Sequence, residues 1–599
     1  MLAPLAFANV TTSSITGRVS VSGKPASGVT VTAESPALQH PRTTLTGPRG
    51  TYWLGALPPG EYDVTFSLAG HTTVTRRAIA ELGLVARTDA TLEPNEDEES
   101  VTSTATTPNV TETTAITTHF DDRELDRLPL GRERTATAIA PGPVSAGEVD
   151  GVPASLGGVA GGGDLIEQIT VVRGAAAADV EASNGQLVVL RTRRGGEDLS
   201  ISLRDTLSNS AWIDNGRIFG EPRIGLQHRF ELTAGGSILP EKLWFFAGGW
   251  NGHDATAVFE ETRGFNAKLQ GQLGDAHHLE GSYTESRAEG TTPFRSDTNS
   301  AWLQYTGVAG PHLTWETQVA HLSVDTSVFN GPFLGGRASD VLSSRVSYVI
   351  PAASGDHVLT AGLNLANGEP FDARALYVSD RWSASRWVVN AGLRYDDAGG
   401  DDRVTPRIAV TYDLGSRGTS ALTASYGEYV LTGVPATFQP ITDPRVLTLG
   451  YAMAIGSMGM LRIDALHRDL GVTSTNSLQL DTHYRIFDRF EAGATYTYSH
   501  SDDELVTPFD SEHSANAWFG AELPIGEHEL GVTLLQRYFQ VSNPPYSEYV
   551  LPTDLAVRYT VPFPRFRLTL AGDVTNILAD GDDPIALPRT LRFWIRARM

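Results

Sequence analysis

The sequence predicts an all-β protein with an N-terminal β-sandwich, a small α+β unit and a C-terminal transmembrane antiparallel β-barrel. Apolar and polar residues alternate with a period of two through most of the chain after residue 197. Turn signals rich in Gly, Pro, Asp and Asn separate the alternating segments. No apolar run approaches the roughly 18 residues that a membrane helix needs, so the pattern excludes a helical membrane protein.

Composition excludes several classes of protein. The 599 residues include no cysteine, so neither a disulfide framework nor a cysteine metal site can form. The net charge of −24 argues against a nucleic-acid partner. We find no nucleophile elbow, cysteine nucleophile or metal motif, so we predict no enzyme activity, no catalytic or metal residues and no cofactor.

The N-terminal region predicts a small folded module. Residues 1–13 contain a small-x-small pattern, Ala6-Phe7-Ala8, and are predicted to be a signal-peptide remnant or a disordered terminus. Residues 14–94 contain short alternating segments separated by turn signals such as "GPRG" and "LPPG". About 80 residues of this kind suit an immunoglobulin-like β-sandwich.

Two different segments follow the sandwich. Residues 95–120 are acidic and then Thr/Ser-rich, which predicts a linker. Residues 121–196 predict a short helix in "DDRELDRLPLG" and strands in "DLIEQITVVRG" and "QLVVLRTRRGG". The glycine run between them lacks the Lys-Ser/Thr of a phosphate loop, so a flexible loop is favoured over nucleotide binding.

Residues 197–599 contain about 22 alternating segments of near ten residues, the length of a tilted membrane strand. A sandwich of this size would exceed the usual domain, and a propeller would show a recurring motif. Closure into one barrel leaves no open edge, so we predict that residues 199–203 pair with residues 591–597.

The last segment, "TLRFWIRARM", shows the alternation clearly. Its apolar members would face a core in a soluble sandwich, or lipid in an outer-membrane barrel whose lumen holds the arginines. The barrel is favoured because it accounts for the whole region. The apolar set is Leu591, Phe593, Ile595, Ala597 and Met599, and the arginines are Arg592, Arg596 and Arg598.

The stretch "TTLTGPRGTYWLGALPPGEYDVTFSLAGH" resembles the carboxypeptidase-regulatory-like domain. Such modules are accessory domains, and the name implies no peptidase. The matching positions are Thr46, Gly50, Tyr52, Leu57, Pro59, Gly60, Tyr62, Val64 and Gly70.

From residue 14 to 599 the order of motifs resembles a TonB-dependent outer-membrane receptor of the Oar-like branch. "DRELDRLPLGRERTATAIAPGPV", "VDGVPA" and "LIEQITVVRGAAAADVEASNGQLVVLRTRRGG" resemble the family's plug, and "GSILPEKLWFFAGG" and "YVSDRWSASRWVVNAGLRYD" resemble its barrel. Only residues 145–148 separate "APGPV" from "VDGVP", so residues 121–196 would form a shortened plug. The plug motif residues are Asp150, Gly151, Arg173, Gly174, Asn184 and Gly185.

The resemblance implies a Gram-negative outer-membrane location with the N-terminal domain in the periplasm, and a monomer surrounded by lipid. Its implied partners are TonB, with ExbB and ExbD, and an unidentified solute. "EESVTSTA", residues 98–105, resembles a TonB box, although a plain linker is the alternative interpretation. The residues expected to contact TonB are Glu99, Ser100, Val101, Thr102 and Ser103.

Three functions from different classes remain open. The first is TonB-coupled uptake of a large or scarce solute. The second is a structural, adhesion or export-associated outer-membrane role without active import, and the third is a binding protein built from β-sandwiches.

The adjacent histidines His277 and His278 could suggest a metal site. They lie in a segment that resembles a tight turn of the family, so we favour a structural role in a turn over metal binding.

Overall fold

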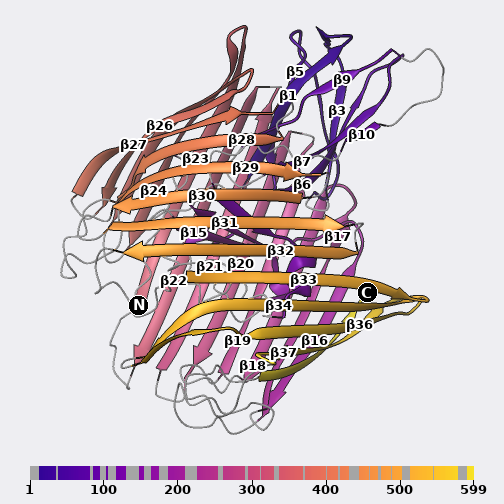
Figure 1. Ribbon diagram of the computed structural model, residues 1–599, viewed down its shortest axis with the longest axis vertical. Coiled ribbons are helices and arrows are strands. Elements are labelled where there is room, and N and C mark those ends of the chain that lie inside the picture. The colour runs from indigo at the N-terminus through magenta and orange to yellow at the C-terminus, as the bar shows by residue number, and fades with distance from the viewer. Residues whose placement is uncertain are drawn as a thin grey trace.

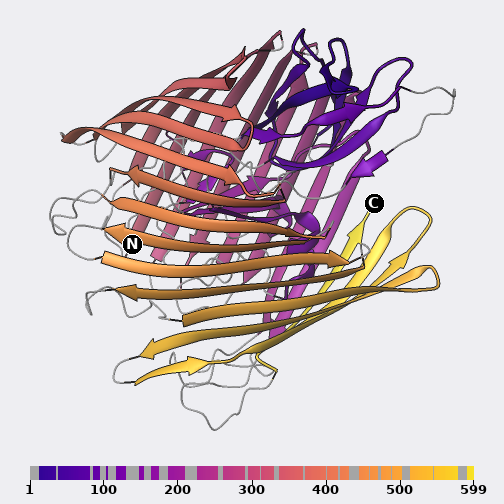
Figure 2. The same ribbon diagram turned by 45° about the horizontal axis from the view of Figure 1, so that its top comes forward.

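The computed structural model describes three parts of the chain, with gaps (Figures 1 and 2). The described residues are 12–35, 38–80, 85–94, 103–105, 116–129, 147–153, 163–173, 178, 186–209, 226–253, 261–274, 276–290, 294–310, 312–328, 336–368, 372–398, 401–415, 419–430, 444–456, 459–469, 474–486, 489–501, 513–543, 546–577 and 590–599. Most of the predicted N-terminal remnant lies outside them, and Ser13 already belongs to the first strand.

The N-terminal domain consists of two β-sheets that pack face to face. One has the order β2-β1-β5, with β8 and β9 also pairing with β1, and the other has the order β10-β7-β6-β3-β4. The strands are β1 (Ser13–Val21), β2 (Lys24–Pro25), β3 (Thr30–Glu34), β4 (Arg42–Leu45), β5 (Thr51–Leu57), β6 (Gly60–Ser67), β7 (Val74–Ala80), β8 (Val85–Arg87), β9 (Ala90–Leu92) and β10 (Ser103–Ala105).

The alternating side chains of these strands form one core. Val31, Tyr62, Val64 and Phe66 are almost fully buried between the sheets, while the residues between them on β6 are partly exposed. The period of two therefore produces the sandwich that the sequence predicts.

The plug is a five-stranded sheet with one short helix. Its strand order is β11-β14-β15-β12-β13. The elements are β11 (Ile116–Phe120), α1 (Asp122–Arg127), β12 (Gly147–Val149), β13 (Val152–Pro153), the 3₁₀ turn η1 (Gly163–Leu165), β14 (Ile166–Arg173) and β15 (Gln186–Thr192). β11 pairs with β14 along all five of its residues, so the plug sheet starts five residues before residue 121.

The predicted short helix is present as α1. Asp121 caps it, since its Oδ1 accepts a hydrogen bond from the Glu124 amide and the Glu124 carboxylate accepts one from the Asp121 amide. This reciprocal capping box satisfies two amides that would otherwise have no partner at the start of a helix.

The rest of the described chain is a closed antiparallel barrel. Twenty-two described strands form the ring, and β35 extends a hairpin on β34. They are β16 (Ser200–Asn209), β17 (Leu226–Leu239), β18 (Leu243–His253), β19 (Glu261–Gln272), β20 (His277–Glu289), β21 (Phe294–Ala309), β22 (Leu313–Val328), β23 (Gly336–Ala352), β24 (Gly355–Gly368), β25 (Ala373–Ala384), β26 (Trp387–Ala398), β27 (Asp401–Asp413), β28 (Ser420–Glu428), β29 (Arg445–Ile455), β30 (Gly459–Asp469), β31 (Ser474–Ile486), β32 (Phe490–Ser501), β33 (His513–Ile525), β34 (His528–Asn543), β35 (Tyr546–Val550), β36 (Thr553–Pro562), β37 (Arg567–Thr575) and β38 (Thr590–Arg598).

The first and last barrel strands close the ring, as predicted, but residues 592–597 pair with residues 203–208 rather than with residues 199–203. β16 pairs antiparallel with β38 from Ser202–Arg598 to Ser208–Arg592, and the backbones of Ile201 and Met599 exchange two further hydrogen bonds. Closure gives the edge backbone groups of both strands a partner, which the interior of a bilayer could not supply.

The two faces of the barrel differ in chemistry. On β38, Phe593 and Ile595 are 45% and 43% exposed on the outside, whereas Trp594 between them is 5% exposed. Leu269 on β19 and Leu393 on β26 also point outward, next to buried Lys268 and Arg394. The alternation therefore separates an apolar outer face from a polar lumen, and no described helix is long and apolar enough to cross a membrane.

The N-terminal domain contacts the barrel rim at which the short turns lie (Figures 1 and 2). The Arg18 guanidinium donates to both carboxylate oxygens of Asp356, beside the β23–β24 turn. Trp53 Nε1 lies 3.0 Å from Thr314 Oγ1, near the β21–β22 turn. One end of the barrel therefore carries the domain.

Changing the outer face of β38 should destabilise the barrel much more than changing its lumenal face. Phe593→Arg places a charge on the lipid face, and we expect a loss of about 2–4 kcal/mol near the bilayer midplane. Arg598→Gln keeps a polar group on the lumenal face and removes only a 3.7 Å contact between a half-exposed guanidinium and Asp122, so it should cost the barrel much less. Urea unfolding of the barrel in lipid vesicles measures both, and equal losses would show that lipid does not surround the apolar face.

Candidate functional site

The arginines of the last strand bind the plug. The Arg596 guanidinium donates to both carboxylate oxygens of Asp126 in α1, at 2.9 and 2.6 Å. Arg592 donates to the carbonyl oxygen of Pro129, just after α1, at 2.9 Å. These contacts explain why an apolar strand carries charged residues on its second face: the lumen contains a folded partner with acidic groups.

A second carboxylate of the plug lies against the closure between β16 and β38. Asp164 in η1 lies 3.0 Å from the Arg204 guanidinium and 3.8 Å from that of Arg596. Both guanidiniums also lie over the ring of Trp594, at 4.4 and 5.6 Å from its centre. The plug is thus fixed to the two strands that close the barrel.

The predicted Asp-Gly motif forms the tight turn between β12 and β13. Asp150 and Gly151 have φ angles of 51° and 79°, a left-handed conformation that glycine adopts without strain. The Asp150 carboxylate accepts hydrogen bonds from the amide and hydroxyl of Thr192 on β15. Its Oδ2 also lies 3.1 Å from Nζ of Lys268 on β19, which joins the turn to the barrel wall.

Lys268 is the centre of a buried charge cluster. Its side chain is fully buried, and its Nζ lies 3.1 Å from Asp150, 3.3 Å from Glu280 and 3.2 Å from the carbonyl oxygen of Thr192. Gln318 of the wall donates to the Asp150 carbonyl oxygen at 2.9 Å. A buried ammonium needs such partners, because the desolvation of an unpaired charge is costly.

The other plug motif residues are only partly described. Arg173 is the last residue of β14 and pairs with Ile116 on β11 and Gln186 on β15. Gly174, Asn184 and Gly185 lie outside the described residues. The structure therefore brings Asp150 and Gly151 to the barrel wall and places Arg173 inside the plug sheet.

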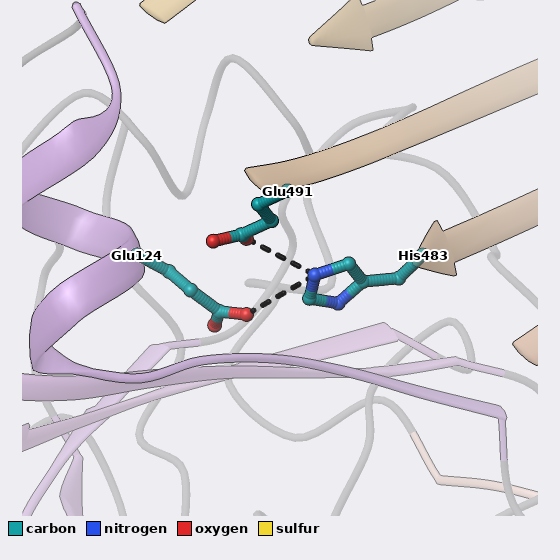
Figure 3. A group of neighbouring side chains, drawn as sticks. All are labelled: Glu124, His483 and Glu491. Atoms are coloured by element: carbon teal, nitrogen blue, oxygen red, sulfur yellow. Dashed lines mark ion pairs between the residues drawn. The ribbon is translucent and has the colours of Figure 1, made fainter. Parts of the chain in front are cut away.

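A third charge cluster surrounds α1 (Figure 3). Arg127 binds Glu491 on β32 and donates to Glu522 on β33 at 2.9 Å. Nε2 of His483 on β31 lies 3.0 Å from Glu491 Oε1 and 3.6 Å from Glu124 Oε1. One turn of helix thus contacts three neighbouring strands of the wall.

Burial raises the pKa of Glu124 to about 8, the Asp121 carboxylate acts in the same direction, and His483 opposes them. Burial is thus the main cause of the raised pKa, and the His483 side chain and the Asp121 amide offset it only in part.

The sequence did not reveal these charge clusters. Their signal is the charged member of an alternating pair, such as Lys268, His483 or Glu491, but nearly every barrel strand carries polar residues on that face. His277 and His278 lie at the start of β20, beyond the β19–β20 turn; His277 contacts the Tyr305 hydroxyl and His278 contacts Gln272.

The segment proposed to bind TonB is described only at its C-terminal end. Glu99, Ser100, Val101 and Thr102 lie outside the described residues. Ser103 begins β10, which pairs in parallel with β7 through Ser103–Val74, Thr104–Thr75 and Ala105–Arg76. The end of this segment is thus an added edge strand of the N-terminal domain.

Removing the Lys268 charge should loosen the plug. Lys268→Met leaves Asp150 and Glu280 buried without their cation, so the free energy of plug opening should fall by about 3–5 kcal/mol. Hydrogen exchange of the β12 and β15 amides in the detergent-solubilised protein measures this change. Lys268→Met with Asp150→Asn should recover part of the loss, and Lys242→Met in an exposed turn is the control. Unchanged exchange in Lys268→Met would contradict this role.

Comparisons with known proteins agree with the domain order. Residues 14–93 match the carboxypeptidase regulatory-like domain, and residues 198–455 match the family described as TonB dependent receptor-like, beta-barrel. The TonB-dependent transporter Oar of Myxococcus xanthus is 25% identical over 390 residues, which are 57% of this chain and 35% of that protein. The chain therefore matches about a third of the relative's length.

Solved structures share the fold. The siderophore receptor PirA from Pseudomonas aeruginosa has a TM-score of 0.62 at 15% identity, over 81% of this chain and 99% of that one. The unliganded ferric citrate transporter FecA has a TM-score of 0.65 at 15% identity, over 82% and 98%. These matches and the closed barrel identify an outer-membrane protein of a Gram-negative bacterium, which is similar to TonB-dependent receptors in its barrel and to carboxypeptidase regulatory-like domains at its N-terminus.

Proposed function

We propose that this protein imports a large or scarce solute across the outer membrane with energy delivered by TonB. The observation that carries the proposal is a folded plug tied to the barrel wall by ion pairs of Asp126, Asp150, Asp164 and Arg127. A wide barrel filled in this way can pass a large solute only if the plug moves or rearranges. Work must therefore be done on the plug, which supports energy coupling over passive diffusion.

Residues 98–105 are our candidate for the segment that TonB, with ExbB and ExbD, would grasp. Strand addition takes its affinity from backbone hydrogen bonds and tolerates varied side chains. β10, at the end of this segment, already pairs as an edge strand, which supports its ability to adopt an extended conformation. The N-terminal domain contacts the rim of short turns, and short turns face the periplasm in barrels of this class. This supports a periplasmic position for the domain and the segment.

The solute remains to be identified by experiment. The similar solved structures include a siderophore receptor and a ferric citrate transporter, and ferric chelates are therefore the first probes. Cobalamin and glycans are the next. The proposal assigns binding and transport by a monomer in the lipid bilayer, without a catalytic step.

Val101→Pro tests the TonB segment. Proline has no N–H and cannot donate to a strand ladder, so energy-dependent uptake should be abolished. Val101→Ala is the matched control and should transport nearly as well as the wild type, since strand addition depends little on side chains. Uptake by whole cells, or growth under starvation for iron, cobalamin or a glycan, gives the readout, and immunoblotting confirms membrane insertion.

The contradicting results are distinct. If Val101→Pro transports normally while a proton-gradient uncoupler stops uptake, TonB contacts another segment. If the uncoupler leaves wild-type uptake unchanged, energy coupling is wrong, and a structural, adhesion or export-associated role becomes the better interpretation. Only residues 145–148 separate two plug motifs, and this short connection is the feature that favours that alternative.

A further inference from the structure

Glu124, His483 and Glu491 present three metal-ligand atoms to one point between the plug and the barrel wall (Figure 3). His483 Nε2 lies 3.0 Å from Glu491 Oε1 and 3.6 Å from Glu124 Oε1. Ligands bound to zinc at about 2.0–2.1 Å in a tetrahedron lie about 3.3 Å apart. The two separations bracket this value, so one cation can reach all three atoms after small side-chain movements.

The imidazole nitrogen of His483 is shielded from solvent and faces two carboxylates (Figure 3). Nε2 forms ion pairs with Glu491 and Glu124, so the protein already places a positively charged group between them when the ring is protonated. A metal ion bound to Nε2 takes the place of the imidazole proton and meets the same two carboxylates.

Contacts on the second oxygen orient each carboxylate. Glu124 Oε2 accepts the Asp121 amide at 2.9 Å in the capping box. Glu491 Oε2 accepts a hydrogen bond from the Arg127 guanidinium. Both Oε1 atoms are therefore turned toward His483. Ligand orientation by such outer contacts is a regular feature of metal sites in proteins.

The surrounding charge favours a cation. Glu124, Glu491 and Glu522 face two guanidiniums, those of Arg127 and Arg485. Arg485 is shared with Glu61 of the N-terminal domain, and its Nη2 lies 3.9 Å from Glu124 Oε1, at the limit of an ion pair. Asp121 adds a further negative charge beside Glu124. Carboxylates thus outnumber guanidiniums in the cluster.

We propose that Glu124, His483 and Glu491 bind a divalent transition-metal ion of the zinc class, which joins the plug to the barrel wall. Glu124 belongs to plug helix α1, whereas His483 and Glu491 belong to the paired barrel strands β31 and β32. One bound ion therefore crosslinks two parts of the protein at the end that also contacts the N-terminal domain through Arg485 and Glu61. Imidazole with two carboxylates suits zinc and leaves its fourth position for water.

Zinc titration of the full-length protein tests the proposal. The protein in detergent is first treated with EDTA, and zinc is then added in competition with a chromophoric chelator. We expect one saturable site, a loss of at least tenfold in affinity in His483→Ala and Glu124→Gln, and no competition from excess magnesium. His321→Ala is the matched control, since exposed His321 lies 2.7 Å from Asp340 in an isolated histidine–carboxylate pair.

A second variant separates metal binding from structural damage. Arg485→Gln removes the positive charge that faces Glu124, so it should tighten zinc binding, whereas damage to the cluster would weaken it. Zinc should also slow hydrogen exchange of α1 in the wild type and not in His483→Ala. The difference in electrophoretic mobility between unheated and heated samples shows whether the barrel of each variant is folded. The proposal would be overturned if folded His483→Ala bound zinc as tightly as the wild type. It would also be overturned if His321→Ala removed all the zinc binding that the wild type shows.

Discussion

The constraint on which the whole structure depends is that each barrel strand has lipid on one side and a folded plug on the other. The backbone N–H and C=O groups of each strand pair with those of its neighbours, and the β16–β38 ladder removes the last open edge. Each side chain must then match either a hydrocarbon or a polar neighbour. Phe593 and Arg596 lie close together on β38, yet one meets lipid and the other meets Asp126.

The contacts between plug and barrel are largely charged, and this affects how the plug is held. A buried ion pair adds little net stability, because the cost of desolvation offsets much of the attraction, but loss of one partner is expensive. The plug is consequently well positioned by Lys268, Arg204 and Arg596 without the large apolar burial that would make its release prohibitive. An apolar cluster that includes Phe120 and Trp518 adds packing near α1.

Patterns with local periodicity were predictable from the sequence. Alternation along β38 predicted its two faces, and the short helix predicted in "DDRELDRLPLG" is α1. The charge clusters were not predictable, since Arg127 and Glu491 are 364 residues apart. Their contact depends on the strand register around the ring and on the orientation of the plug in the barrel. No local sequence pattern encodes either of these.

The boundaries of the linker show a related limit. Residues 103–105 and 116–120 lie in a stretch that was predicted to be a linker from its acidic and Thr/Ser-rich composition, yet both form strands by pairing with β7 and β14. The β-propensity of a segment depends on its own residues alone. An edge strand also depends on a neighbouring strand that offers unpaired N–H and C=O groups.

The pairing of β10 with β7 has a consequence for access. The edge of a β-strand accommodates one neighbour, and β10 joins β7 over only three residue pairs. Each hydrogen bond in such a ladder contributes about 0.5–1.5 kcal/mol net, so the ladder is weak enough to exchange. If TonB binds residues 98–105 by strand addition, as we propose, it must first displace the β10–β7 ladder, so the N-terminal domain competes with TonB for this stretch of backbone.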